Sequence, residues 1–147
     1  MSGPIGPEPA GPDGFRGMKG RLPFPIAGRA EIRTVRRPGA SGPGVEMLAP
    51  VGTPVRFVFS GRVAFADKYD PFGQIVILDH GDHYYTLMGD LAAIEVKVGD
   101  DLSAGAKIGT VGRRSGDDSK AAGSALYFEV RHGASTVEPG PWLGLGP

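Results

Sequence analysis

Glycine and proline divide this chain into short segments, and this division limits its fold more than any other feature. The 147 residues include 25 glycines and 14 prolines. From residue 23 onward the segments between these turn formers are rich in Val, Ile, Phe and Tyr, and none has a sustained helical period. We predict strands at 54–66, 74–80, 83–88, 94–98, 107–111 and 125–131. Short strands separated by turns predict an all-β antiparallel sandwich.

The first 22 residues differ in composition from the rest of the chain. They contain Pro4, Pro7, Pro9 and Pro12 together with many glycines, and therefore offer little apolar surface to offset the entropy of ordering. We predict that residues 1–22 form a flexible tail or linker. Residues 23–147 are then one domain, long enough to build a core of its own.

Charge and composition exclude several classes of protein. Sixteen basic and sixteen acidic side chains give a formal net charge of zero, which argues against nucleic acid as a partner. The absence of cysteine excludes disulfides and thiolate metal sites. No apolar run is long enough to cross a membrane, and the N-terminal residues lack the pattern of an export signal. These features alone fit either a cytoplasmic protein or a domain excised from a longer one.

Five sequence motifs occur in an order that is typical of one family. They are GVEMLAPVGTPV at 44–55, SGRV at 60–63, GQIVILDHG at 73–81, YYTLMGDL at 84–91 and ALYFEV at 125–130. Together they resemble the LytM-type, lysostaphin-like zinc metallopeptidases, and the resemblance extends over residues 23–143. It implies a LytM-type β-sandwich with an open groove across one face.

A sixth motif is shared with a second class of domain. Residues 98–109 resemble a hairpin found both in LytM-type domains and in biotinyl and lipoyl carrier domains. A carrier needs a modifiable lysine at an exposed hairpin tip. Lys19 follows Met18 as such a lysine would, but it lies in the glycine-rich tail, outside any predicted strand pair. The LytM-type interpretation is therefore preferred.

The catalytic positions of the family are altered in this sequence. In LytM-type peptidases two histidines and an aspartate bind zinc, and two further histidines assist catalysis. The resemblance places the zinc ligands at Gly42, Glu46 and Tyr127 and the catalytic histidines at Asp90 and Ala125. A catalytic zinc needs three protein ligands, and of these side chains only that of Glu46 matches the family's ligand chemistry. We therefore expect no metal, no cofactor and no peptide hydrolysis, as in the catalytically inactive, EnvC-like branch, which residues 127–131 and 139–143 also resemble.

The histidines present do not rebuild a metal site in this interpretation. His80 and His83 flank a tight turn, where structural roles explain them, and His132 is expected to be solvated at a strand end. The polar loop at residues 113–120 is likewise expected to be solvated.

The resemblance implies that the former active-site groove persists as a binding surface. Strand alternation directs Tyr127, Glu129 and Arg131 towards the groove and Leu126, Phe128 and Val130 into the core. Neither Tyr127 nor Arg131 is then expected to face the core. Aromatic residues, Met and Arg are enriched at interfaces, which favours partner binding by the groove. The positions assigned to it are Pro43, Glu46, Phe72, Ile75, Met88, Tyr127 and Arg131.

The resemblance also implies a function and a location. A degenerate domain of this type is expected to activate a periplasmic N-acetylmuramoyl-L-alanine amidase, its cell-wall amidase partner, during septal peptidoglycan splitting in cell division and cell separation. Peptidoglycan itself, and a division-site membrane complex reached through upstream regions, are further partners left open. Two alternatives remain, a zinc-dependent peptidoglycan endopeptidase and a non-catalytic peptidoglycan-binding module. The periplasmic location is expected although this chain carries no export signal of its own.

Overall fold

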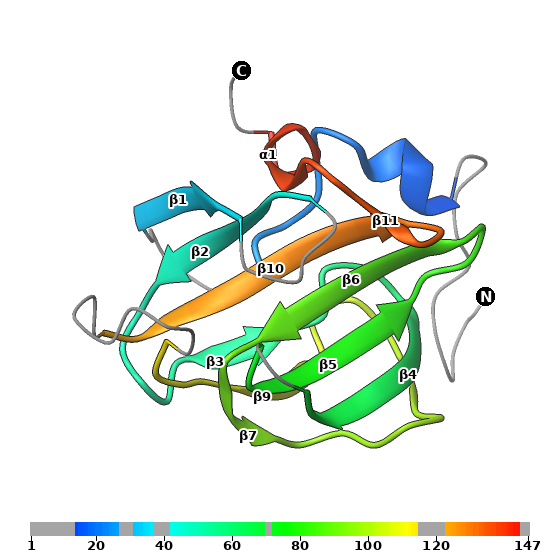
Figure 1. Ribbon diagram of the computed structural model, residues 1–147. Helices are drawn as coiled ribbons and strands as arrows, with labels where there is room; N and C mark the ends of the chain where they lie inside the picture. The colour runs from blue at the N-terminus through cyan, green and yellow to red at the C-terminus, as the bar shows by residue number, and fades with distance from the viewer. Residues whose placement is uncertain (1–13, 27–30, 37–41, 70–71, 115–122, 145–147) are drawn as a thin grey trace.

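The computed structural model describes residues 14–26, 31–36, 42–69, 72–114 and 123–144 (Figure 1). Its regular structure is almost entirely β-strand. The strands are β1 Glu31–Val35, β2 Gly44–Leu48, β3 Pro54–Arg56, β4 Gly61–Lys68, β5 Gln74–Asp79, β6 Tyr84–Gly89, β7 Leu91–Ile94, β8 Asp101–Leu102, β9 Lys107–Val111, β10 Ala125–His132 and β11 Ser135–Val137. Two short helices, η1 at Gly14–Met18 and α1 at Pro139–Trp142, complete the described structure.

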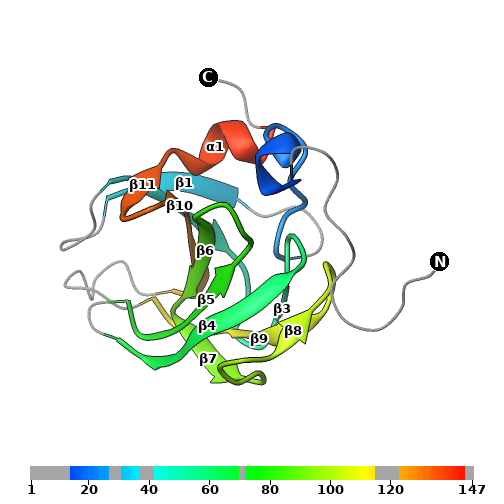
Figure 2. The same cartoon turned by 90° about the vertical axis from the view of Figure 1, so that its right-hand side faces the viewer.

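The strands form two antiparallel sheets. The large, eight-stranded sheet has the order β1-β2-β10-β6-β5-β4-β8, with β11 paired to β10, and the three-stranded sheet has the order β3-β9-β7. The large sheet curves, and the small sheet lies on one side of it (Figure 2). Val55 of β3 and Ile108 of β9 pack into the same core as Val45 of β2. The predicted all-β sandwich is confirmed.

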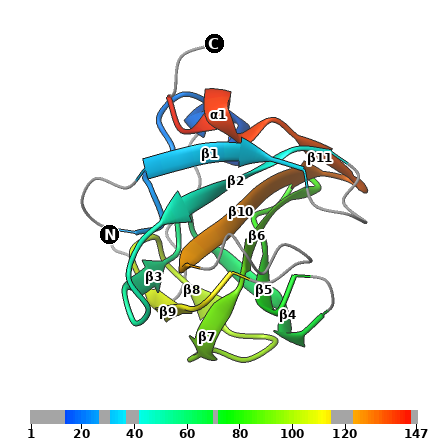
Figure 3. The same ribbon diagram turned by 60° about the vertical axis from the view of Figure 1, so that its left-hand side comes forward.

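Strand β10 lies near the middle of the large sheet and determines which side chains share a face (Figure 3). Phe128 pairs with Val45 on β2 and with Met88 on β6, and all three side chains belong to the main core. Successive residues of a strand point to opposite faces, so Tyr127 and its alternate neighbours point away from that core. We call the face that carries Phe128 the core face and the face that carries Tyr127 the groove face.

Four of the six predicted strands are confirmed, and the other two are wrong in extent or position. Strands β5, β6, β9 and β10 lie within one residue of the predicted bounds. The predicted strand 54–66 is two strands, because the chain turns at 57–60 between β3 and β4. The predicted strand 94–98 is displaced to Leu91–Ile94, and Val98 is 63% exposed. Strands β1, β2, β8 and β11 were not predicted, being short or interrupted by polar residues.

The N-terminal segment packs against the domain further than its composition suggests. Phe15 of η1 is buried and stacks on Trp142 at 4.8 Å between ring centroids and on His80 at 4.6 Å. Leu22 is also buried, and its backbone N–H donates to the Trp142 carbonyl at 3.1 Å. The predicted tail boundary at residue 22 is therefore wrong for residues 14–22, because buried apolar side chains and backbone hydrogen bonds to Trp142 attach the segment to the domain. Residues 1–13 lie outside the described residues.

None of the described residues belongs to a helix that is long and apolar enough to span a membrane.

Candidate functional site

A shallow apolar groove crosses β4, β5 and β6 on the groove face and ends at β10. It consists of two adjoining cavities of about 330 Å³ and 440 Å³. Phe65, Ile77, Arg131 and Ala134 line both cavities, which makes the two parts continuous. The other lining residues are Ala64, Tyr69, Phe72, Ile75, Tyr85, Leu87 and Gly133.

Tyr127 lies beneath the surface beside this groove. Its side chain is 0% exposed and packs in a small apolar cluster with Phe72, Ile75 and Leu87. The Tyr127 and Phe72 rings stack with their centroids 5.3 Å apart. The ring also covers Gly44 on β2, where an added Cβ would come within 2.7 Å of the phenol oxygen. A glycine at position 44 therefore makes room for this tyrosine.

A chain of hydrogen bonds runs along the groove face of β10. The Tyr127 hydroxyl donates to Oε2 of Glu129, whose side chain is fully buried. The other carboxylate oxygen, Oε1, accepts a hydrogen bond from Nε of Arg131 at 2.7 Å. Arg131 is 27% exposed and is the residue of this hydrogen-bonded series that reaches the groove. The buried carboxylate is thus satisfied from both sides, as burial of a charge requires.

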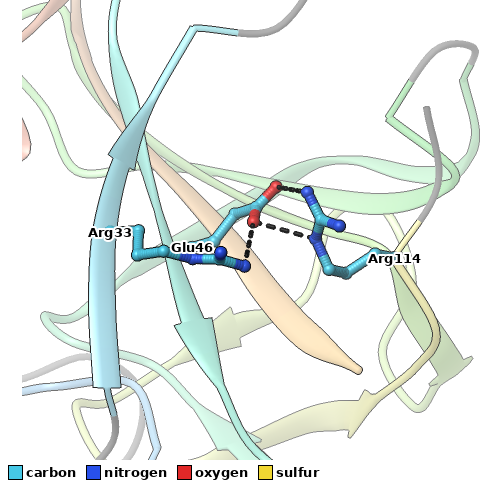
Figure 4. Close-up of polar contacts among 3 residues, drawn as sticks. All are labelled: Arg33, Glu46 and Arg114. Atoms are coloured by element: carbon cyan, nitrogen blue, oxygen red, sulfur yellow. Dashed lines mark hydrogen bonds and ion pairs between the residues drawn. The ribbon is translucent and has the colours of Figure 1, made fainter. Parts of the chain in front are cut away.

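A second buried carboxylate on the groove face is held by two arginines (Figure 4). Glu46 of β2 accepts two hydrogen bonds from Arg114, from Nε to Oε1 at 2.9 Å and from Nη2 to Oε2 at 3.1 Å. Nη2 of Arg33 on β1 lies 3.5 Å from Oε1. The bidentate geometry and the burial of Glu46 make the Arg114 pair the stronger of the two. Arg114 was expected to be solvated with its loop, and that expectation is wrong for this residue; residues 115–122 lie outside the described residues.

The structure brings only some of the predicted groove residues to the groove. Phe72, Ile75 and Arg131 line it. Tyr127 and Glu46 point to the same face but are buried beneath it, so the expectation that Tyr127 does not face a core is wrong. The tyrosine fills a second, smaller core that strand alternation alone does not reveal. Pro43 is half-buried just before β2.

The placement of Met88 in the groove is wrong. Met88 pairs with Phe128, and its side chain is fully buried in the main core on the opposite face of the sheet. The neighbouring residue on β6, Leu87, pairs with Glu129 and lines the groove. A shift of one residue along a strand reverses the face, which accounts for the error.

His80 has a structural role in the described structure. Its Nδ1 lies 3.0 Å from the Ser60 carbonyl oxygen, and its Nε2 lies 2.8 Å from Oγ1 of Thr86. Burial lowers the pKa of His80 to about 4, so the ring is neutral near pH 7. His83 adopts a positive φ of 66° in the turn, and the exposed His132 stacks on Tyr84 at 4.1 Å.

The positions that correspond to the family's zinc site do not fit a zinc ion. A Cβ added at Gly42 would lie 2.1 Å from Oγ1 of Thr136, so a larger side chain there requires at least the Thr136 side chain to shift. The ring of Tyr127 is packed on Phe72 and Gly44, and Glu46 is engaged by arginine. Within the described ranges no three His, Cys, Asp or Glu side chains are grouped closely enough to hold a metal.

Ala125 and Asp90, which the resemblance aligns with the family's two catalytic histidines, lie close to each other. Ala125 is fully buried at the start of β10, and Asp90 is buried immediately after β6 with a φ of 60°. Both are joined to Gly112, which donates its N–H to the Asp90 carbonyl at 2.9 Å and accepts from the Ala125 N–H at 3.3 Å. The fold therefore brings Asp90 and Ala125 to the same backbone segment.

Comparison with known proteins establishes the family. The sequence profile of peptidase family M23 matches residues 41–139, which include β2 to β11 and the groove. The chain belongs to peptidase family M23. The predicted LytM-type resemblance is thereby confirmed.

Several curated members of the M23 family are similar to this chain. The murein hydrolase activator EnvC of Escherichia coli K12 is 36% identical over 101 residues, which cover 69% of this chain and 23% of that protein. The cell division protein DipM of Caulobacter vibrioides is 32% identical over 124 residues, or 82% of this chain and 19% of that protein. The chain thus spans about a fifth of the length of these relatives.

Solved structures of the M23 family share the fold. The catalytic domain of lysostaphin from Staphylococcus simulans superimposes with a TM-score of 0.66 at 25% identity, covering 78% of this chain and 92% of that domain. A zinc-containing peptidase from Vibrio cholerae gives a TM-score of 0.65 at 27% identity, covering 78% of this chain and 37% of that one. The family therefore includes peptidases as well as an activator.

Sequence reasoning missed several residues of this M23 site. Phe65, Ile77 and Leu87 line the groove, and the alternation of β5 and β6 could have identified the last two. The β-bulge in β4 between Val63 and Phe65 changes the alternation there, so Phe65 could not be assigned in this way. Nothing in the sequence indicated that Arg114 would reach Glu46, 68 residues away.

Proposed function

We propose that this M23 domain is a non-catalytic activator of a periplasmic N-acetylmuramoyl-L-alanine amidase and binds the amidase through the apolar groove. The observation that carries the proposal is the buried Tyr127 ring at the position of a zinc-binding histidine, packed on Gly44 and Phe72. A peptidase of this family needs a metal to activate water, and this packing leaves no ligand there.

Similarity to the murein hydrolase activator EnvC supports an activating role rather than loss of all function. The groove supplies a surface of suitable chemistry, since its lining is mainly apolar with one arginine. An apolar helix of the amidase would leave the amidase active site and lie in this groove. Activation then follows only if the domain binds the open amidase more tightly than the closed one.

The process and the location form part of the same proposal. Splitting of septal peptidoglycan takes place in the bacterial envelope, so the domain would act in the periplasm. Similarity to the cell division protein DipM supports a role in division and cell separation. Binding to peptidoglycan, or to a division-site membrane complex through upstream regions, is compatible with this role and is not required by it.

The test is an activation assay on labelled peptidoglycan. Purified amidase from the same organism is mixed with this domain, and the release of label is followed with and without the domain. We expect no release by the domain alone and a clear increase when both proteins are present. Label released by the domain alone, and abolished by a chelator, would instead establish a zinc endopeptidase.

A binding measurement distinguishes the amidase activator from the third candidate, a non-catalytic peptidoglycan-binding module. The domain is incubated with purified sacculi and, in parallel, with immobilised amidase. We expect retention by the amidase. Retention by sacculi without any binding or stimulation of the amidase would identify a peptidoglycan-binding module and overturn the proposal.

A further inference from the structure

We propose that Arg131 binds a carboxylate on the partner segment that occupies the groove, and that the buried pair Tyr127 and Glu129 orients Arg131 for this contact. The inference rests on the proposed function, which supplies an amidase as the partner. It adds the chemistry of the bound segment, apolar side chains with an acidic group among them, and it makes Tyr127 a positioning residue that does not touch the partner.

The first support is the charge of the groove. Among the described residues that line the two cavities, Arg131 is the only Lys, Arg, Asp, Glu or His side chain, and it lines both. The carboxylate that balances it, Glu129, is fully buried below. A segment lying in the groove therefore meets one guanidinium surrounded by Phe65, Phe72 and Ile77. The complementary occupant is apolar and carries one negative charge.

The second support is the direction in which the guanidinium donates. Of the residues that the structure describes, Glu129 is the one that pairs with Arg131, and it does so through Nε. The Nη1 and Nη2 groups form the other edge of the planar fork. Two parallel N–H donors match the two oxygens of a carboxylate, a geometry that a single carbonyl cannot reproduce.

The third support is the hydrogen-bond chain below Arg131. Glu129 accepts from Arg131 through Oε1 and from the Tyr127 hydroxyl through Oε2, so both oxygens of the carboxylate are held. Tyr127 is itself fixed by stacking on Phe72. A guanidinium that is already oriented loses less side-chain entropy when a ligand binds. Tyr127 would therefore affect binding through Arg131, although it lies beneath the groove.

The experiment measures the dissociation constant for the amidase at low and at physiological salt. The variants are Arg131→Met, Arg131→Lys, Tyr127→Phe and the double variant with Arg131→Met and Tyr127→Phe. Arg62→Met is the matched control, since Arg62 is also paired with a carboxylate, Asp101, but does not line the groove. Thermal unfolding of each variant establishes that it is folded.

We expect Arg131→Met to weaken amidase binding by about tenfold or more and to reduce its salt dependence, because a charge-assisted contact is lost. Arg131→Lys should keep the salt dependence while binding less tightly than the wild type. On its own, Tyr127→Phe should weaken amidase binding by a few-fold. Added to Arg131→Met, it should weaken binding no further. Arg62→Met should bind as the wild type does.

Three results would overturn parts of the inference and remain distinguishable. If the folded Arg131→Met and Arg131→Lys variants bind with wild-type affinity and salt dependence, no carboxylate contact exists, although amidase activation can still hold. If Tyr127→Phe weakens binding equally in the presence and absence of Arg131, Tyr127 does not act through it. If the wild-type domain does not bind the amidase at all, the proposed function itself fails.

Discussion

The two faces of the large sheet are stabilised in different ways. On the core face, side chains such as Phe128, Val130 and Met88 contact the extensive main core that the small sheet also joins. On the groove face, a few aromatic and aliphatic side chains form a smaller cluster, and two carboxylates, Glu46 and Glu129, are buried on the same face. Apolar packing is non-directional, whereas a buried carboxylate depends on particular donors.

The difference between the two faces indicates on which face side chains can be replaced without unfolding this M23 domain. The larger apolar cluster lies on the core face, and we therefore expect most of the stability to come from that face. The groove face contains the specific contacts, those of Arg114 with Glu46 and of Arg131 with Glu129. The groove proposed to bind a partner is therefore separated by one layer of backbone from the packing of the main core.

The largest expected effect tests whether the core face dominates stability. Replacing Phe128 with alanine should lower the free energy of unfolding by about 3–5 kcal/mol, because it leaves a cavity in the main core. Ile77→Ala, on the groove face, is the matched control, and it should cost clearly less because Ile77 is only half-buried. Urea unfolding measures both. Equal losses would show that the two faces contribute alike.

The next effect concerns pH and the polar end of the core face. His80 has a pKa of about 4 in the folded chain, lowered from 6.5 chiefly by burial. The unfolded chain therefore binds a proton as the pH falls through 6.5, and the folded chain does so only near pH 4. Stability from this group is fully present above pH 6.5 and is lost towards pH 4, by about 3 kcal/mol.

Urea unfolding of the wild type and of His80→Gln across this pH range measures the contribution of His80. The variant should show the weaker pH dependence between pH 6.5 and 4, because glutamine does not titrate. The same slope in both proteins would exclude His80 as the source.

A smaller effect sharpens the comparison on the groove face. Arg114→Met should lower the free energy of unfolding by about 1–3 kcal/mol, because Glu46 remains buried and loses its bidentate partner. Arg62→Met is the control, since the pair of Arg62 with Asp101 is exposed and should contribute nothing measurable. Thermal unfolding at equal salt compares them. An Arg114→Met variant as stable as the wild type would show that Glu46 remains satisfied without Arg114.

The smallest expected effect concerns metal. In the proposed non-catalytic role the domain holds no zinc, because Tyr127 is packed on Phe72 and Glu46 is paired with arginine, so a chelator should leave the melting temperature of the domain unchanged. Differential scanning fluorimetry with and without EDTA, followed by elemental analysis for zinc, measures this. A lowered melting temperature that added zinc restores would require metal on the groove face and break the contrast with the core face.

The fold was largely predictable from the sequence because it depends on local signals. Turn residues mark the ends of strands β5, β9 and β10. The alternation of residues along β10 correctly assigned Leu126, Phe128 and Val130 to the core. The order of the family motifs then indicated the arrangement of the strands. The attachment of the N-terminal segment was not predictable in this way, because it depends on Phe15 stacking with Trp142 from the other end of the chain.

The candidate site could be located from the sequence but not described from it. Ordered motifs and alternating residues by themselves determined the all-β class, the M23 resemblance and the altered identities at Gly42, Glu46, Asp90, Ala125 and Tyr127. Only the tertiary structure decided that Tyr127 is buried, that Met88 faces the core and that Arg114 pairs with Glu46. The physical reason is that strand periodicity determines the direction of a side chain, whereas its burial and its partners depend on segments that the fold brings from elsewhere in the chain.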